Sequence, residues 1–214
     1  MIEEKVAANS TELKKLGIIE LRDGLTLERI RVEYSWILEA DIEGAILGEV
    51  DEKLVWEGGI WHNGTWEAGI WYKGTWEAGT WNNGEWYNGT WLSGCWKMGY
   101  WHRGQWLSGI WKDGTWEFGI WDNGEWLFGK WLSGIWHNGN WKAGYWDRGE
   151  WYDGTWHSGQ WHDGKWYNGT WLSGSWSFGE WYDGTWHSGR YFNGTASKDD
   201  EKPPIAKKIS NLYI

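Results

Sequence analysis

The sequence predicts an all-β protein, a four-sided repeat β-solenoid with a small N-terminal cap. Three observations support this. Tryptophan recurs at every fifth position from Trp56 to Trp186 without interruption, which accounts for 27 of the 28 tryptophans. Glycine follows each of them by three residues, and the pair that ends in this glycine is often Asn-Gly, Asp-Gly or Ser-Gly. A period of five fits neither a helix nor a plain strand, but it does fit a short extended piece followed by a turn.

Each five-residue unit, or pentad, divides into an extended triplet centred on tryptophan and a two-residue turn. Asn-Gly and Asp-Gly pairs favour tight turns because glycine adopts positive φ freely and Asn or Asp tolerates it. A glycine every five residues argues against a helix, since each costs about 1 kcal/mol relative to alanine. The predicted turn positions include Gly64, Gly84, Gly124, Gly154 and Gly194, the last in a closing unit in which Tyr191 replaces tryptophan.

The tryptophans form the predicted core. Each indole carries roughly 150–250 Å² of surface that must leave water, and a closed solenoid buries this surface within one chain. With four pentads per coil, the 28 units would make seven coils, about 34 Å long at ~4.8 Å per coil. The alternative is a meander of very short β-hairpins with every indole on one face. The predicted core residues include Trp56, Trp61, Trp66, Trp91, Trp131, Trp171 and Trp186.

Residues 1–55 differ from the repeat and are interpreted as an N-terminal cap or attachment region, because repeat arrays need atypical ends. We expect a short helix over residues 2–16. Strands are expected over residues 18–21 and over residues 30–37, from their β-branched and aromatic content. Residues 40–47 (ADIEGAIL) already carry a five-residue rhythm of small residues, offset from the tryptophan register.

The array is assigned to residues 56–195 and is followed by a polar, proline-containing linker over residues 196–204. The tail over residues 205–214 is either a frayed end or a docking peptide. Its candidate docking residues are Ile205, Ile209, Leu212 and Ile214. Within the array, EWYDGTWHSG occurs at 150–159 and again at 180–189, and WLSG occurs at 91, 131 and 171. Echoes of thirty and forty residues indicate that the duplicated unit was two pentads.

The pentad spacing, with a bulky central residue and a small residue two positions earlier, resembles the pentapeptide-repeat family, as does the segment over residues 40–47. That resemblance implies a right-handed square β-helix. The Trp/Gly units are similar to Trp/Gly-rich pentad proteins of bacteriophages and environmental bacteria, some of which look like virion components. This second resemblance implies a structural role.

No residue pattern indicates catalysis, a metal site or a cofactor, so the protein is not expected to be an enzyme. All six histidines follow a tryptophan, in a column expected to face solvent: His62, His102, His137, His157, His162 and His187. The single cysteine, Cys95, allows no disulfide within the chain. A net charge of −10 argues against binding nucleic acid.

The leading functional hypothesis is a non-catalytic structural component of a bacteriophage particle, namely a fibre, spacer or decoration module. It would be made in the host cytoplasm, because residues 1–10 lack a signal peptide's basic start and apolar stretch, and no apolar run is long enough to cross a membrane. We expect protein partners, bound through residues 1–55 or 205–214, and a homo-oligomer is compatible with this role.

A carbohydrate- or protein-binding module is the alternative hypothesis, with exposed tyrosines as the glycan contacts: Tyr72, Tyr87, Tyr152, Tyr167 and Tyr182. A DNA-mimicking topoisomerase inhibitor ranks lower. Residues 56–195 hold 14 acidic and 9 basic residues, a net charge of −5 with the two signs interspersed.

Overall fold

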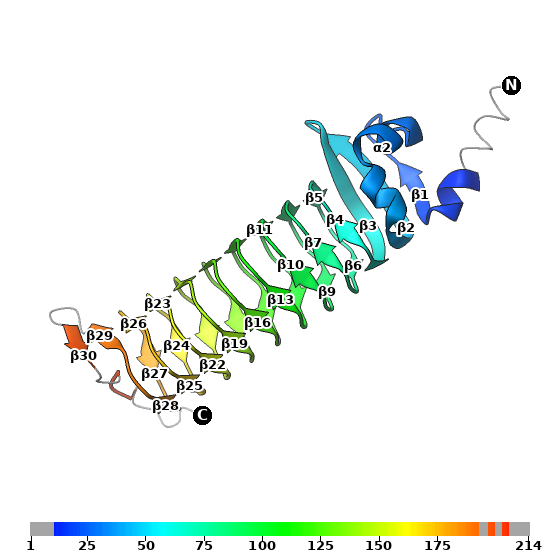
Figure 1. The fold of residues 1–214 in the computed structure, drawn as a ribbon. Coiled ribbons are helices and arrows are strands. Elements are labelled where there is room, and N and C mark those ends of the chain that lie inside the picture. The colour runs from blue at the N-terminus through cyan, green and yellow to red at the C-terminus, as the bar shows by residue number, and fades with distance from the viewer. Residues whose placement is uncertain (1–10, 193–196, 200–202, 206–214) are drawn as a thin grey trace, which may run out of the picture.

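A computed structural model of the chain describes residues 11–192, 197–199 and 203–205. Almost all of it is parallel β-structure, stacked into a solenoid of about nine turns (Figure 1). Strand β5 (Ile70–Trp71) pairs in parallel with β8 (Glu85–Trp86), which places Trp71 opposite Trp86. The same fifteen-residue register links successive coils along the array.

The predicted solenoid is therefore confirmed, and the alternative meander is wrong because neighbouring pentads lie in one coil and do not pair with each other. The predicted number of sides is also wrong. Fifteen residues per coil correspond to three pentads, so the solenoid has three faces instead of four. Three indoles meet at each level, and each contacts the next edge to face, with ring centroids 5.9 Å apart for Trp56 and Trp61. A square coil of the same pentads would have to enclose a fourth indole.

The three faces are defined by their strands. The first face contains part of β3 (Lys53–Asn63), then β5, β8, β11 (Tyr100–Trp101), β14 (Thr115–Trp116), β17 (Lys130–Trp131), β20 (Tyr145–Trp146), β23 (Gln160–Trp161), β26 (Ser175–Trp176) and β29 (Arg190–Phe192). The second contains the rest of β3, then β6 (Thr75–Trp76), β9 (Thr90–Trp91), β12 (Gln105–Trp106), β15 (Ile120–Trp121), β18 (Ile135–Trp136), β21 (Glu150–Trp151), β24 (Lys165–Trp166) and β27 (Glu180–Trp181). The third contains β4 (Thr65–Trp66), β7 (Thr80–Trp81), β10 (Cys95–Trp96), β13 (Ile110–Trp111), β16 (Glu125–Trp126), β19 (Asn140–Trp141), β22 (Thr155–Trp156), β25 (Thr170–Trp171) and β28 (Thr185–Trp186).

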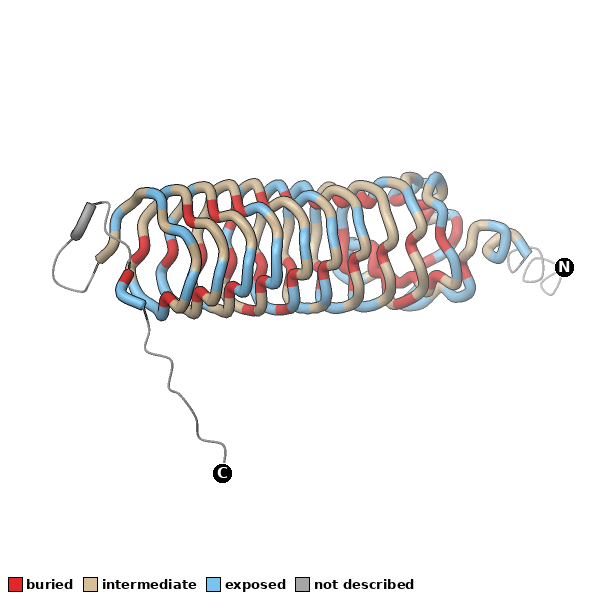
Figure 2. The backbone as a smooth tube through the Cα atoms, turned by 90° about the horizontal axis from the view of Figure 1, so that it is seen from below, coloured by how far each residue is buried: buried red, intermediate tan, exposed pale blue. Residues whose placement is uncertain are grey.

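The core is three parallel stacks of indoles, one behind each face. Successive rings in a stack lie nearly parallel, with centroids 4.8 Å apart for Trp91 and Trp106. Every tryptophan from Trp56 to Trp176 is fully buried, and Trp181 is nearly so. In each coil, one buried position therefore lies on each of the three faces of the rod (Figure 2). Trp186 in the last coil is only partly buried.

The glycines form the corners where the chain turns from one face to the next. Gly84 has φ of +136°, and a Cβ atom there would lie 2.4 Å from the carbonyl oxygen of Gly69 in the preceding coil. The predicted turn glycines Gly64, Gly124 and Gly154 adopt the same conformation, whereas Gly194 lies outside the described residues. Each pentad also makes two backbone hydrogen bonds to the coil before it. In the unit around Trp86, Glu85 donates to Gly69 and Tyr87 donates to Trp71.

The N-terminal cap combines strands with three short helical segments among the described residues. Residues 11–15, within the predicted helix, are helical, and β1 (Ile18–Leu21) matches the first predicted strand. The second predicted strand, residues 30–37, is wrong: α2 (Leu27–Glu33) and the 3₁₀-helix η1 (Ser35–Glu39) occupy it. Thr26 caps α2 by accepting a hydrogen bond from the Arg29 N–H. Leu27, Ile30 and Tyr34 are buried at helical spacing. The segment therefore forms a helix although it contains β-branched residues.

Residues 40–47, whose pattern resembles the pentapeptide-repeat family, do not form a solenoid coil. They belong mostly to β2 (Asp41–Val50), a continuous strand that pairs antiparallel with β3. The turn between them consists of Asp51 and Glu52, both with positive φ, as a tight two-residue hairpin requires. β3 contains Trp56 and Trp61 and so begins both the first and the second faces. β2 therefore covers the N-terminal edge of these two faces, and β1 pairs with β2 in parallel.

The two ends of the array are closed differently. At the N-terminal end of the third face, the ring of Trp36 packs edge-on against Trp66, with centroids 5.0 Å apart. At the C-terminal end, β30 (Ser197–Asp199), inside the predicted linker, pairs antiparallel with β29. Ile205 forms a single parallel bridge to Trp181 on the second face. The other candidate docking residues, Ile209, Leu212 and Ile214, lie outside the described residues.

Candidate binding groove

The residues on either side of each tryptophan face outward and form columns along the rod. Because the coil repeats every fifteen residues, side chains that touch within a column are fifteen apart in sequence. Within one column Lys165 pairs with Glu150 at 3.4 Å, and between neighbouring columns the Tyr152 hydroxyl donates to Glu150 at 3.1 Å. Surface contacts of this kind stabilise a protein little, so these columns are where sequence can vary for recognition.

The exposed tyrosines of the glycan-binding hypothesis fall into two groups on different faces. Tyr152, Tyr167 and Tyr182 form a ladder on the second face, with successive centroids 4.8 and 5.1 Å apart. On the first face, Tyr72 packs against Tyr87, and Tyr87 stacks on His102 at 4.3 Å. Rings in such ladders cover one another's faces. A sugar that binds by stacking needs an uncovered ring face, so the interior of these ladders offers it little.

Four of the six histidines pair with a carboxylate fifteen residues away. The distances are 2.8 Å for His62 with Glu77, 2.9 Å for His102 with Glu117, 2.8 Å for His137 with Asp122 and 3.3 Å for His162 with Asp147. The hydrogen bond to Glu77 raises the pKa of His62 above its usual value. His157 instead lies 3.3 Å from the ammonium group of Lys142, and burial together with this charge lowers its pKa.

These pairs do not converge into a metal site. His157 lies on the third face and His162 on the first, although they are one pentad apart in sequence. The described part of the chain contains no group of three or more His, Cys, Asp or Glu residues arranged to hold a metal ion. It also contains no helix long and apolar enough to cross a membrane.

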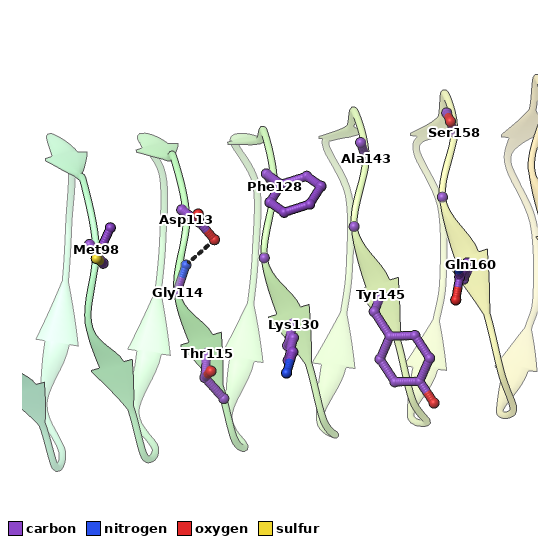
Figure 3. Close-up of a pocket in the computed structure, with 13 residues that line it drawn as sticks. Met98, Asp113, Gly114, Thr115, Phe128, Lys130, Ala143, Tyr145, Ser158 and Gln160 are labelled. Carbon is purple, nitrogen blue, oxygen red and sulfur yellow. Dashed lines mark hydrogen bonds between the residues drawn. The ribbon is translucent and has the colours of Figure 1, made fainter.

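A groove of about 560 Å³ runs along the corner between the third and first faces (Figure 3). This is within the ~300–1,000 Å³ range of ligand sites in proteins. We call it the corner groove. Its floor consists of corner glycines from four coils, Gly114, Gly129, Gly144 and Gly159. One wall is the column Met98, Asp113, Phe128, Ala143 and Ser158, and the other is the column Thr115, Lys130, Tyr145 and Gln160.

The depth of the corner groove follows from the glycines that let the coils stack. A Cβ atom on Gly144 would lie 2.5 Å from the carbonyl oxygen of Gly129, so no side chain can rise from the floor. The size of the wall side chains then determines how open each stretch of the groove is. Ala143 is the smallest wall residue, and it leaves a notch between Phe128 and Ser158. In Figure 3 the Phe128 ring extends from the wall toward this notch, and Tyr145 projects from the opposite column.

The groove continues toward the N-terminus. A second hollow, of about 450 Å³, follows the same corner from Lys53 and Ala68 to Tyr100 and shares Met98 with the first. Sequence reasoning missed both, because the single-pentad pattern gives no sign of which residues lie side by side. Knowledge of the fifteen-residue coil would have placed Phe128 beside Ala143.

Comparison with models of known protein families, with curated proteins and with solved structures finds no match to this chain. Its function therefore has to be argued from the arrangement of its own residues.

Proposed function

We propose that the protein is a non-catalytic structural protein, a rigid spacer within a larger assembly such as a bacteriophage particle. The observation that carries this proposal is the continuity of the array. Three stacks of indoles and the backbone hydrogen bonds on all three faces run from the cap to the last coil without insertion or bulge. Such a stack resists bending because any bend must separate packed rings on one side.

The distinct ends support the same proposal. A cap of strands and short helices closes one end, while β30 lies at the other (Figure 1). Ile205 forms its bridge to Trp181 near that second end. A spacer needs two different attachment points held at a fixed separation. Partner proteins are proposed to bind at residues 1–55 or 205–214, which leaves the faces of the rod between them.

Rigidity can be measured with two spin labels on one column. Asn83 and Ser173 are exposed, lie at equivalent positions on either side of six coil steps, and can be changed to cysteine in a Cys95→Ser background. We expect one narrow distribution of distances centred near about 29 Å, from ~4.8 Å per coil. A broad or bimodal distribution in double electron–electron resonance would rule out a rigid spacer.

Membership in a particle needs a separate measurement. Quantitative mass spectrometry of particles purified from a lysate of cells that carry the gene should recover the chain at a constant ratio to the major particle proteins. Its absence from purified particles would contradict the virion role and leave the rigidity measurement unaffected.

A further inference from the structure

We propose that the corner groove binds a neutral, linear, β-1,4-linked oligosaccharide that lies along the axis of the solenoid, with a sugar ring in the notch beside Ala143. Binding of an oligosaccharide goes beyond the role of a spacer and does not depend on it. Four features of the groove support this ligand: an uncovered aromatic ring, the polar groups beside it, the balance of charges and the spacing of the coils.

Phe128 supplies an uncovered aromatic face. Its side chain is 56% exposed, and no other aromatic ring of the described residues packs against it. Its neighbours in the column, Asp113 and Ala143, are not aromatic, in contrast to the tyrosine ladder on the second face. Tyr145, in the opposite wall, is directed away from the notch (Figure 3), with its hydroxyl donating to Asp147 at 3.3 Å and its ring beside that of His162, so the ring offered to a ligand is that of Phe128. The apolar C–H face of a pyranose packs well on such a ring.

Polar groups line the same stretch and are available to sugar hydroxyls. Asp113 accepts a hydrogen bond from the N–H of Gly114 through Oδ1 at 2.7 Å, which fixes the carboxylate beside the floor. Among the described residues, nothing bonds to its other oxygen or to the side chains of Ser158 and Gln160. A mostly apolar hollow with a few placed acceptors and donors is the usual composition of a ligand site.

The charges of the groove favour a neutral ligand. Asp113 and Lys130 are the only acidic and basic side chains in its walls, one on each side, so they cancel. In the adjoining hollow, Lys53 and Glu85 balance in the same way and form an ion pair at 3.5 Å. A phosphate-rich or acidic polymer would require an excess of basic residues.

The spacing of the coils separates a glycan from a peptide. Wall residues repeat once per coil, about every 4.8 Å. An extended peptide presents side chains on one side about every 6.7 Å, so it loses register with the walls after one step. In a β-1,4-linked chain each sugar advances by roughly one coil and successive rings are flipped, so the same side of the chain recurs after roughly two coils and stays in register with the walls. The four coil steps from Met98 to Ser158 thus accommodate a short oligosaccharide in register.

Isothermal titration calorimetry on the full chain tests the proposal. The probes are cellohexaose, chitohexaose and β-1,4-mannohexaose, with an alternating Thr–Val hexapeptide as the competing kind of occupant. We expect at least one hexasaccharide to bind. Phe128→Ala should weaken binding by about 2- to 12-fold, the equivalent of one aromatic contact of ~0.5–1.5 kcal/mol. Ala143→Phe should abolish it by filling the notch, and the fold should tolerate this change because Phe128 occupies the same column.

Two matched variants serve as controls. Phe118→Ala removes an equally exposed ring (56%) at the corner between the first and second faces, and Ala78→Phe adds a ring at the corner between the second and third. Both should leave binding unchanged, and circular dichroism should show every variant folded. Failure of all three hexasaccharides to bind, stronger binding of the peptide, or sugar binding that survives Ala143→Phe would each overturn the proposal.

Discussion

The glycine at each corner serves two purposes at once, and this explains why it recurs in every pentad of the array. It adopts a positive φ that other residues reach only with strain. It also lets the carbonyl oxygen of the preceding coil approach to within van der Waals contact of the backbone. Satisfying both demands excludes every side chain. Gly58 makes a useful contrast, because it lies just before a corner, lacks positive φ, and a Cβ atom there would have only the end of the Lys73 side chain within 4 Å.

We predict that Gly124→Ala destabilises the protein by about 2–4 kcal/mol, from the strained φ together with overpacking. Gly124 has φ of +132°, and its Cβ would lie 2.5 Å from the oxygen of Gly109. Gly58→Ala should be neutral or slightly stabilising, because alanine restricts the unfolded chain. Urea unfolding followed by circular dichroism compares the two. Equal effects of the two substitutions would refute this account of the corners.

The pKa values of two histidines should differ from the ordinary histidine value in opposite directions. The hydrogen bond to Glu77 raises the pKa of His62, so its contribution to stability is present at low pH and is lost as pH rises through the folded-state pKa. Burial and Lys142 lower the pKa of His157, so its protonation costs stability as pH falls below the unfolded-state value. We predict that NMR titration of the imidazole C–H signals resolves His62 above and His157 below an ordinary histidine.

The contribution of Lys142 can be isolated. Lys142→Gln should move the pKa of His157 upward and leave that of His62 unchanged, because the two histidines lie on different faces and about six coils apart. If His157 titrates identically with and without Lys142, burial alone accounts for its lowered pKa.

At the scale of elements, the sequence pattern predicted the solenoid, its tryptophan core and the corner glycines, because each depends on a single pentad. It did not reveal how many pentads make a coil, since every pentad has the same register. The forty-residue echo of WLSG illustrates this: Leu92, Leu132 and Leu172 lie on the second, first and third faces. The corner groove depends on neighbours fifteen residues apart, so it could not be seen either.

The cap was predicted least well, for reasons of local competition. Residues 30–37 have the composition of a strand, but Thr26 caps a helix just before them and the buried residues follow a helical spacing. The hairpin turn at Asp51 and Glu52 lacks the glycine that usually marks such turns. In the cap, tertiary contacts with β3 and with the first coil outweigh the local conformational propensities of the residues.

Trp36 covers the open end of one indole stack, and we predict that Trp36→Ala destabilises the protein by roughly 2–3 kcal/mol. This is less than the ~3–5 kcal/mol of a fully buried tryptophan, because Trp36 is partly exposed. The uncovered Trp66 should become accessible to acrylamide. Val32→Ala, at a 66% exposed position in the same cap, should change neither stability nor quenching. Unchanged quenching in Trp36→Ala would show that Trp66 is covered by other groups.

At the scale of the whole molecule, the coil is the unit that can be added or removed. Each coil contacts mainly its two neighbours, so stability in such arrays is close to a sum over coils and interfaces. Removing fifteen residues joins equivalent corners and leaves every downstream residue on its own face. Removing five keeps the Trp/Gly register but rotates everything downstream by one face, which separates the two halves of each surface column.

We therefore predict that deletion of residues 104–118, which joins Arg103 to Gly119, leaves a folded rod one coil shorter. The distance between spin labels at Asn83→Cys and Ser173→Cys should fall from about 29 to about 24 Å and stay narrow, because the labels remain on one column. Deletion of only residues 114–118 should also fold, since every indole still meets equivalent neighbours, but it moves the second label to another face. The fifteen-residue deletion would move the second label to another face only if the coil held a number of pentads other than three. The paired deletions thus measure the number of sides directly.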